Sequence, residues 1–181
     1  EPMRTIPPGE SLTYTFTAQR AGIWMYHCST MPMSAHIAAG MFGAVIIEPP
    51  GLPEVDASYV LQQSGAYVSG DGRSEIQEVD AEAALHGQPS FYAFNGTAFQ
   101  YDHRPIEVRT GERVRLWLLN AGPAGVMSFH VVGGQFDTTY AEGAYLLKDG
   151  RDAFGSQSGG SQALALTPGQ MLENIHAVQR R

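Results

Sequence analysis

The sequence predicts an all-β protein built from β-sandwich domains, and two observations lead to this prediction. Short apolar segments follow one another along the chain, and clusters of glycine, proline and polar residues separate them. Short strands with turn residues between them are typical of a sandwich. Helical patterns are scarce, since only residues 77–86 and 171–179 have a helical composition. The predicted fold class is therefore all-β.

Three strands are predicted in the first region. Residues 11–18, "SLTYTFTA", place Leu12, Tyr14 and Phe16 alternately with threonines, which is the two-residue period of a half-buried strand. Residues 23–28, "IWMYHC", and 41–50, "MFGAVIIEPP", predict the next two strands. The residues between these two strands are expected to form a loop.

Residues 51–57 are rich in proline and acidic residues and predict a linker between a first domain, residues 1–50, and a second, residues 58–181. Further strands are expected in the second domain, in residues 58–64, 90–96, 105–122, 126–134 and 162–169. A complete sandwich of this type needs about 100 residues. The first domain is therefore expected to be incomplete, with only its C-terminal part in this chain.

Charge and composition exclude several classes of partner. The net charge of the 181-residue chain is −7, and Arg180 and Arg181 form its one basic cluster, so nucleic acid is not an expected partner. No apolar run approaches the roughly 20 residues that span a bilayer, so no membrane insertion is expected. The single cysteine, Cys28, cannot form an internal disulfide.

The loop between the second and third predicted strands contains Cys28, His36 and Met41. Each of them alone has an ordinary structural explanation: a small buried cysteine, a structural histidine or a core methionine. Together they form the pattern C-x7-H-x4-M across one loop. A blue-copper site needs a thiolate, two imidazoles and a weakly bound axial thioether. The pattern predicts a type 1 copper site to which this loop gives three ligands.

His27 directly precedes Cys28, and this position suggests a second metal site. Successive residues of a strand point to opposite faces. If Cys28 faces a type 1 copper inside the domain, His27 faces outward and can bind a different copper. The two metals would then be joined by one short covalent path. The alternative is a surface histidine that happens to adjoin a ligand.

The chain resembles a known family in residues 26–50, "YHCSTMPMSAHIAAGMFGAVIIEPP". The same resemblance continues through "FNG" at 94–96, "GERVRLWLLNAG" at 111–122 and "SFHVVGGQFD" at 128–137. These segments are similar to two-domain copper nitrite reductases and related two-domain multicopper oxidases. The resemblance implies cupredoxin-like Greek-key domains. Residue by residue it makes Cys28, His36 and Met41 type 1 copper ligands and His27 a type 2 copper ligand.

The resemblance also implies a function. The family member would be a copper oxidoreductase that passes electrons from a donor through type 1 to type 2 copper and reduces a small oxidant, dioxygen or nitrite. It would form a homotrimer and be periplasmic or secreted. The alternatives are a blue-copper electron-transfer module without a catalytic metal, and a truncated fragment that binds no metal. Ser29, which follows Cys28, argues against a laccase-type trinuclear cluster.

Several positions depart from the family pattern. No histidine precedes His27, whereas the family has an upstream type 1 histidine, an upstream type 2 histidine and an acid that handles protons. Gln135 stands where nitrite reductases carry a histidine after two glycines. His130 is the best remaining candidate for an active-site role, and a hydrogen-bonded structural histidine is the alternative. The final residues, 168–181, do not resemble the closing strands of the family, so the chain is expected to be cut at both ends.

Overall fold

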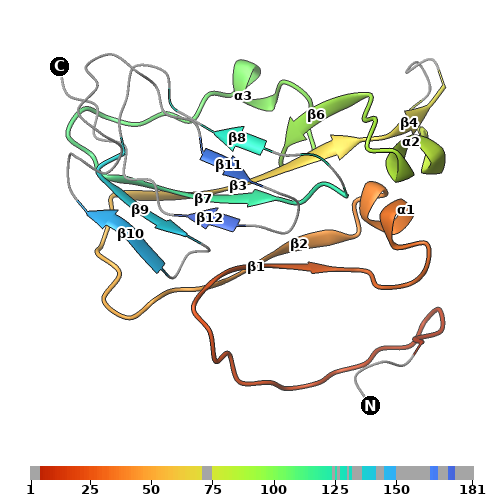
Figure 1. Ribbon diagram of the computed structural model, residues 1–181, viewed down its shortest axis with the longest axis horizontal. Coiled ribbons are helices and arrows are strands. Elements are labelled where there is room, and N and C mark those ends of the chain that lie inside the picture. Colours follow the sequence, from red (N-terminus) through yellow and green to blue (C-terminus); the bar gives the residue numbers. More distant parts are fainter. Residues whose placement is uncertain are drawn as a thin grey trace.

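The computed structural model describes residues 5–70, 75–123, 125, 127–129, 131, 136–141, 145–149, 164–166 and 171–173. This part of the chain is mostly β, with three short helices (Figure 1). The prediction that the chain is mostly β is confirmed. None of the described helices combines the length and apolar character needed to cross a membrane.

The largest sheet within the described residues has six strands in the order β10-β9-β12-β7-β3-β6. Their bounds are β3 Ala57–Ala66, β6 Phe91–Phe94, β7 Val114–Asn120, β9 Thr138–Ala141, β10 Tyr145–Asp149 and β12 Met171–Glu173. β7 runs parallel to β3, and the other neighbouring strands are antiparallel. Every residue of β7 is buried, because both faces of this strand are covered.

The two faces of β7 carry two separate hydrophobic clusters. Val114, Leu116 and Leu118 pack with Leu61 and Phe136 on one face. The opposite face is covered by a two-stranded antiparallel hairpin formed by β1, Gly22–His27, and β2, Phe42–Ile47. The second cluster lies between the hairpin and the sheet. It consists of the buried Ile23 of β1 together with Trp117, Leu119 and Ala121. The hairpin and the large sheet therefore share one core.

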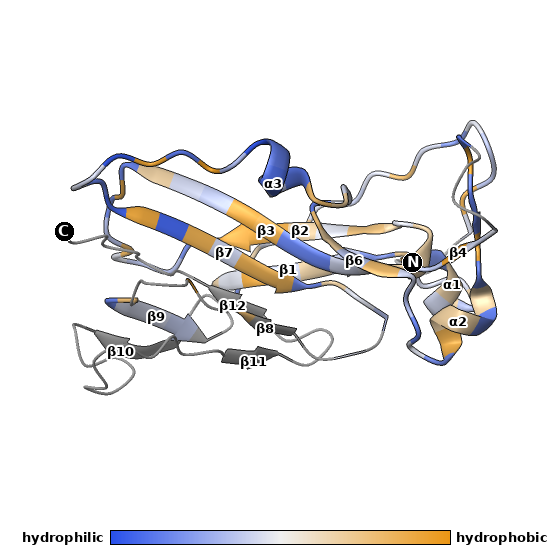
Figure 2. Cartoon of the chain, turned by 90° about the horizontal axis from the view of Figure 1, so that it is seen from above, coloured by the Kyte–Doolittle hydropathy of each residue, from blue (hydrophilic) through white to orange (hydrophobic). Residues whose placement is uncertain are grey.

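Smaller elements complete the described part. β8, Met127–Phe129, pairs with β11, Leu164–Leu166, and β4, Val68–Ser69, pairs with β5, Glu78–Val79. The helices are α1, Met33–Ala38, α2, Ala81–Leu85, and α3, Gln100–His103. In Figure 2 the central strand β7 is mostly hydrophobic in colour, whereas α3 is hydrophilic. This agrees with the absence of any buried residue from α3.

The strand expected at residues 11–18 is not formed, and this prediction was wrong. These residues have no regular secondary structure, and Tyr14 and Phe16 expose 67% and 68% of their surface. Alternation alone does not make a strand, because its backbone groups need a neighbouring strand as partner. No strand pairs with this segment in the described part of the chain, and Figure 1 shows it running apart from the sheets.

Three other local predictions need correction. Residues 171–173, expected to be helical, form β12, because they pair with β7 on one side and β9 on the other. The predicted strand over 105–122 is shorter, since residues 105–113 are irregular and only Val114–Asn120 forms β7. The expected helix over 77–86 contains β5 and the shorter helix α2. Residues 174–179 lie outside the described residues.

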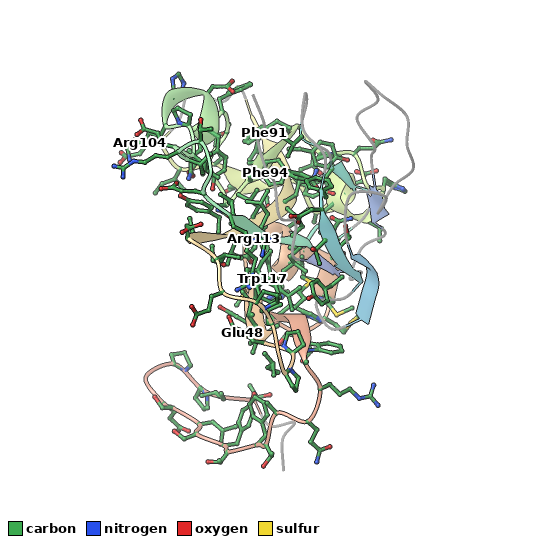
Figure 3. All side chains as sticks on the ribbon, turned by 90° about the vertical axis from the view of Figure 1, so that its left-hand side faces the viewer. Glu48, Phe91, Phe94, Arg104, Arg113 and Trp117 are labelled. Atoms are coloured by element: carbon green, nitrogen blue, oxygen red, sulfur yellow. The ribbon has the colours of Figure 1, made fainter. Side chains whose placement is uncertain are left out.

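The connection between the hairpin and the large sheet is held by Arg115 of β7. This side chain is only 6% exposed, and its Nη1 lies 3.8 Å from Oε1 of Glu48, just after β2. Its Nη2 donates a hydrogen bond to the backbone oxygen of Pro53, and its guanidinium carbon lies 6.0 Å from the centre of the Trp117 ring. Figure 3 labels Glu48 and Trp117 at this junction. The buried guanidinium of Arg115 thus joins β7 to the residue that follows β2 and to the connecting segment.

Candidate metal centre

The two ends of the hairpin loop carry two of the predicted ligands. Cys28 directly follows β1, and Met41 directly precedes β2. The Cys28 N–H donates a hydrogen bond to the Met41 carbonyl at 3.0 Å, which extends the ladder of the hairpin by one step. The two residues are therefore held side by side by the same antiparallel pairing that forms β1 and β2.

His36 reaches this place from α1, a helix that was not expected in the loop. The Met41 N–H donates to the His36 carbonyl at 3.1 Å, so the end of the helix is tied to the start of β2. The Cys28 Sγ lies 3.6 Å from the His36 Nδ1, and both residues are partly buried. The structure thus links Cys28, His36 and Met41, the three residues of the sequence pattern.

The turn into β2 depends on two glycines. Gly40 has a φ of +87°, in the left-handed region that glycine adopts without steric cost. Gly43 lies under the ring of Tyr26 on the opposite strand, where an added Cβ would come within 2.3 Å of the Tyr26 hydroxyl. Both glycines allow the backbone to pass tightly on either side of Met41. Met41 itself is 50% exposed at this end of the hairpin.

Thr30 favours the thiolate form of Cys28. The side-chain hydroxyl of Thr30, and then its backbone amide, form hydrogen bonds that lower the pKa of Cys28, while burial acts weakly in the opposite direction. The thiolate is the form of cysteine that binds metals and attacks electrophiles. Thr30 is not among the residues that the sequence predicts for the site, although its hydroxyl, two residues after the cysteine, is visible in the sequence.

His27 is the last residue of β1 and is exposed, as is its neighbour Tyr26. Its Nδ1 donates a hydrogen bond to the Cys28 carbonyl at 2.8 Å, which leaves Nε2 as the ring nitrogen able to bind a ligand. Among the described residues, no three side chains of histidine, cysteine, aspartate or glutamate come together as a metal site. His130 and Gln135, the other two predicted site residues, lie outside the described part of the chain.

The donor atoms present fit part of a type 1 copper site. A thiolate and an imidazole that bind one metal at about 2.3 and 2.0 Å, roughly 110–120° apart, lie about 3.6 Å from each other. The distance between Cys28 Sγ and His36 Nδ1 has this value. The second imidazole that such a site needs is not supplied by the residues that the structure describes near Cys28.

A mostly β fold whose paired strand ends bring together a thiol, an imidazole and a methionine resembles the cupredoxin-type copper proteins. Comparison with known proteins agrees. The model of the multicopper oxidase family matches residues 1–51. The copper-containing nitrite reductase of Neisseria meningitidis serogroup A is 37% identical over 158 residues, which cover 85% of this chain and 41% of that protein. The corresponding protein of Neisseria gonorrhoeae is 36% identical over 157 residues.

Solved structures show the same relationship. A copper nitrite reductase from Nitrosomonas europaea matches 97% of this chain and 59% of its own length, with 31% identity and a TM-score of 0.74. A copper-containing nitrite reductase from Thermus scotoductus matches 96% of this chain and 38% of its own length, with 29% identity and a TM-score of 0.76. The chain is therefore similar to multicopper oxidases in its first 51 residues and to copper-containing nitrite reductases over most of its length. It spans about 40% of the length of the curated relatives it matches.

Proposed function

We propose that this chain is part of a copper-dependent oxidoreductase and that Cys28, His36 and Met41 are ligands of a type 1 copper. The observation that carries the proposal is the 3.6 Å distance between Cys28 Sγ and His36 Nδ1 in a loop whose ends are joined through Met41. Similarity to copper-containing nitrite reductases supports copper as the metal. When bound, copper would supply reversible one-electron chemistry at this place.

Each of the three loop residues would have a different role as a ligand. The Cys28 thiolate, favoured by the hydrogen bonds of Thr30, is the strongest donor and fixes the soft character of the site. His36 offers Nδ1 from a helix that is tied to β2 through Met41. Met41 would supply a weakly bound thioether, which would influence the redox potential more than the affinity.

His27 would hold a second, type 2 copper through Nε2. The hydrogen bond between its Nδ1 and the Cys28 carbonyl supports Nε2 as the ring nitrogen that would bind the metal. Electrons from a donor protein or small molecule would cross from one metal to the other through the Cys28–His27 linkage. The oxidant would be dioxygen or nitrite, and His130 and Gln135 would line its site.

The relatives support further proposals about the whole molecule. Residues 1–50 would be the C-terminal part of a first Greek-key cupredoxin domain, residues 51–57 a linker, and residues 58–181 a second such domain with an atypical tail. The natural protein that contains this sequence would assemble as a homotrimer in the periplasm or outside the cell.

A second candidate function is an electron-transfer module that has the blue copper alone. It is favoured by the surroundings of His27, because no group of three metal-binding side chains is found among the described residues. Gln135, in place of the histidine of nitrite reductases, points the same way.

The test is made on the natural protein that contains this sequence, loaded with copper. Paramagnetic resonance counts type 1 and type 2 copper separately, and a reduced donor with dioxygen or nitrite measures turnover. We expect both signals and oxidant-dependent turnover, and His27→Ala should remove the type 2 signal while the type 1 signal remains. A type 1 signal alone, with no turnover, would establish the electron-transfer module instead. Absence of both signals would reject copper function altogether.

A further inference from the structure

The helix that carries His36 is supported from outside its own loop. α1 packs against α2, although the two helices are more than 40 residues apart in the sequence, and Figures 1 and 2 both show them at the same end of the molecule. Each helix has one buried residue, Ile37 in α1 and Ala84 in α2. The contact between the two helices thus connects the loop that carries His36 to a part of the chain more than 40 residues further on.

α1 has little support of its own. It has six residues, and Pro32 at its N-cap makes no capping hydrogen bond through a side chain. A helix this short is not stable on its own in water and takes its stability from packing. Its position therefore depends on what it packs against.

α2, by contrast, is attached to the end of β3 by hydrogen bonds on both sides of the helix. Before the helix, the Asp80 N–H donates to the Tyr67 carbonyl at 3.0 Å, and the Asp80 carboxylate caps the helix by accepting from the Ala83 N–H at 2.8 Å. After the helix, the Ser90 N–H donates to the Ala66 carbonyl at 2.7 Å. Tyr67, whose carbonyl accepts the first of these bonds, is 1% exposed. These hydrogen bonds hold α2 in place, so α1 packs against a fixed helix.

The helical geometry connects this contact to the metal ligand. Consecutive side chains of a helix are turned by about 100° around its axis. When Ile37 is buried, the neighbouring His36 is directed toward Cys28, where its Nδ1 meets the sulfur at 3.6 Å. A rotation or shift of α1 on α2 would change this distance directly.

We propose that α2 is a positioning element of the metal centre, that the buried Ala84 lies against Ile37 of α1, and that this contact sets the placement of the His36 ring relative to Cys28. The inference rests on the proposed type 1 site. In this inference α2, which contains no proposed ligand, helps to shape a site whose proposed ligands all lie in residues 28–41. Ala84 acts through Ile37 and His36 and does not itself touch the metal.

The test uses the 181-residue chain and two matched substitutions on one helix. Ala84→Leu adds bulk at the buried contact, and Ala81→Leu makes the same change at an exposed position of α2. The first measurement needs no metal: the nuclear Overhauser effect between the His36 ring and the Cys28 β-protons reports their distance. The second is the copper(II) affinity in the presence of imidazole as the missing ligand, read from the thiolate-to-copper absorption band.

We expect Ala84→Leu to weaken the Overhauser effect and to lower copper affinity about 10-fold or more, the usual cost of disturbing a residue that orients a ligand. Ala81→Leu should leave both values as in the unchanged chain. Equal effects from the two substitutions, or no effect from either, would overturn the inference.

Thermal unfolding is recorded for each variant. If Ala84→Leu does not fold, Ala84→Ser and Ile37→Val decide the matter, and an unchanged Overhauser effect in both would also overturn the inference. A wild-type chain that shows the Overhauser effect but no thiolate-to-copper band would reject the proposed copper site. The positioning of His36 by α2 would then be decided by the metal-free measurement alone.

Discussion

Cys28 and Met41 face each other across the open end of the β1–β2 hairpin, where the Cys28 N–H donates to the Met41 carbonyl at 3.0 Å. The same pairing that holds the two strands together also closes the metal loop. The loop therefore has a fixed width before any metal binds, and His36 reaches into it from α1. This arrangement explains why three candidate ligands can lie within fourteen consecutive residues.

Substitution of Cys28 and of Met41, the two proposed sulfur ligands, should have different consequences. Cys28→Ala should abolish any blue absorption of the copper-loaded natural protein, because the band arises from the thiolate. Met41→Leu should retain the band and mainly change the reduction potential, because the axial thioether binds weakly. Visible spectroscopy and redox titration separate the two effects. A blue band that survives Cys28→Ala would show that another sulfur or another site is responsible.

Removal of the Thr30 hydroxyl should make Cys28 less acidic. The hydrogen bonds of Thr30 lower the pKa of Cys28 from its ordinary value of 9.0, so below pH 9.0 the folded chain holds more thiolate than an unperturbed cysteine would. Thr30→Val should move the pKa upward toward 9.0, and alkylation of the metal-free chain near neutral pH should become slower. The rate is measured against pH with iodoacetamide.

Ser29→Ala is the matched control for this experiment, because it removes a hydroxyl from the adjacent residue. Its alkylation profile should stay that of the unchanged chain. A Thr30→Val profile with the same midpoint as the unchanged chain would show that the hydroxyl does not stabilise the thiolate.

Arg115 and Glu48 should contribute unequally to stability. Arg115→Ala removes a buried group and leaves the Pro53 carbonyl without its donor, which should lower the free energy of unfolding by about 1–3 kcal/mol. Glu48→Gln changes a residue that is 65% exposed and 3.8 Å from its partner, so its cost should stay below about 1 kcal/mol. Denaturant unfolding of both variants measures the difference. Equal costs would mean that the ion pair, rather than the buried arginine, holds the junction.

The arrangement of the metal loop was largely predictable because its contacts are local. Cys28, His36 and Met41 lie between two neighbouring antiparallel strands, so the spacing in the sequence nearly determines their proximity. The helix within this loop was not predictable. α1 is short, lacks a capping side chain and depends on α2, a contact between distant parts of the chain that no local pattern reveals.

The errors in the fold have a related cause. Residues 11–18 have the alternation of a strand but find no pairing partner among the described residues, and residues 171–173 have a helical composition but pair with strands on both sides. Local propensity is a weak preference that tertiary contacts override. Thr30 was not predictable for a different reason: its hydroxyl acts on the Cys28 sulfur and not on a metal, so no metal-ligand pattern includes it.

Nitrite should be a poor oxidant for the natural protein that contains this sequence. Reduction of nitrite to nitric oxide consumes protons, and a histidine can relay them near neutral pH, whereas the amide of Gln135 cannot. His130 lies five residues earlier in the sequence, and if both residues belonged to one regular strand this odd offset would direct them to opposite faces. Turnover with nitrite and with dioxygen is compared for the unchanged protein and Gln135→His. Strong nitrite turnover before the substitution, or no gain after it, would contradict this account.

Copper binding by the 181-residue chain tests most directly the claim that Cys28, His36 and Met41 form three quarters of a type 1 site. Copper(II) is titrated into the chain with and without imidazole, and the thiolate-to-copper absorption is recorded. A site short of one imidazole is open to water and oxidation, so we expect weak binding alone and an intense band when imidazole is added. The band should disappear in Cys28→Ala and His36→Ala. Tight, stoichiometric binding without imidazole, or no band under either condition, would contradict the claim.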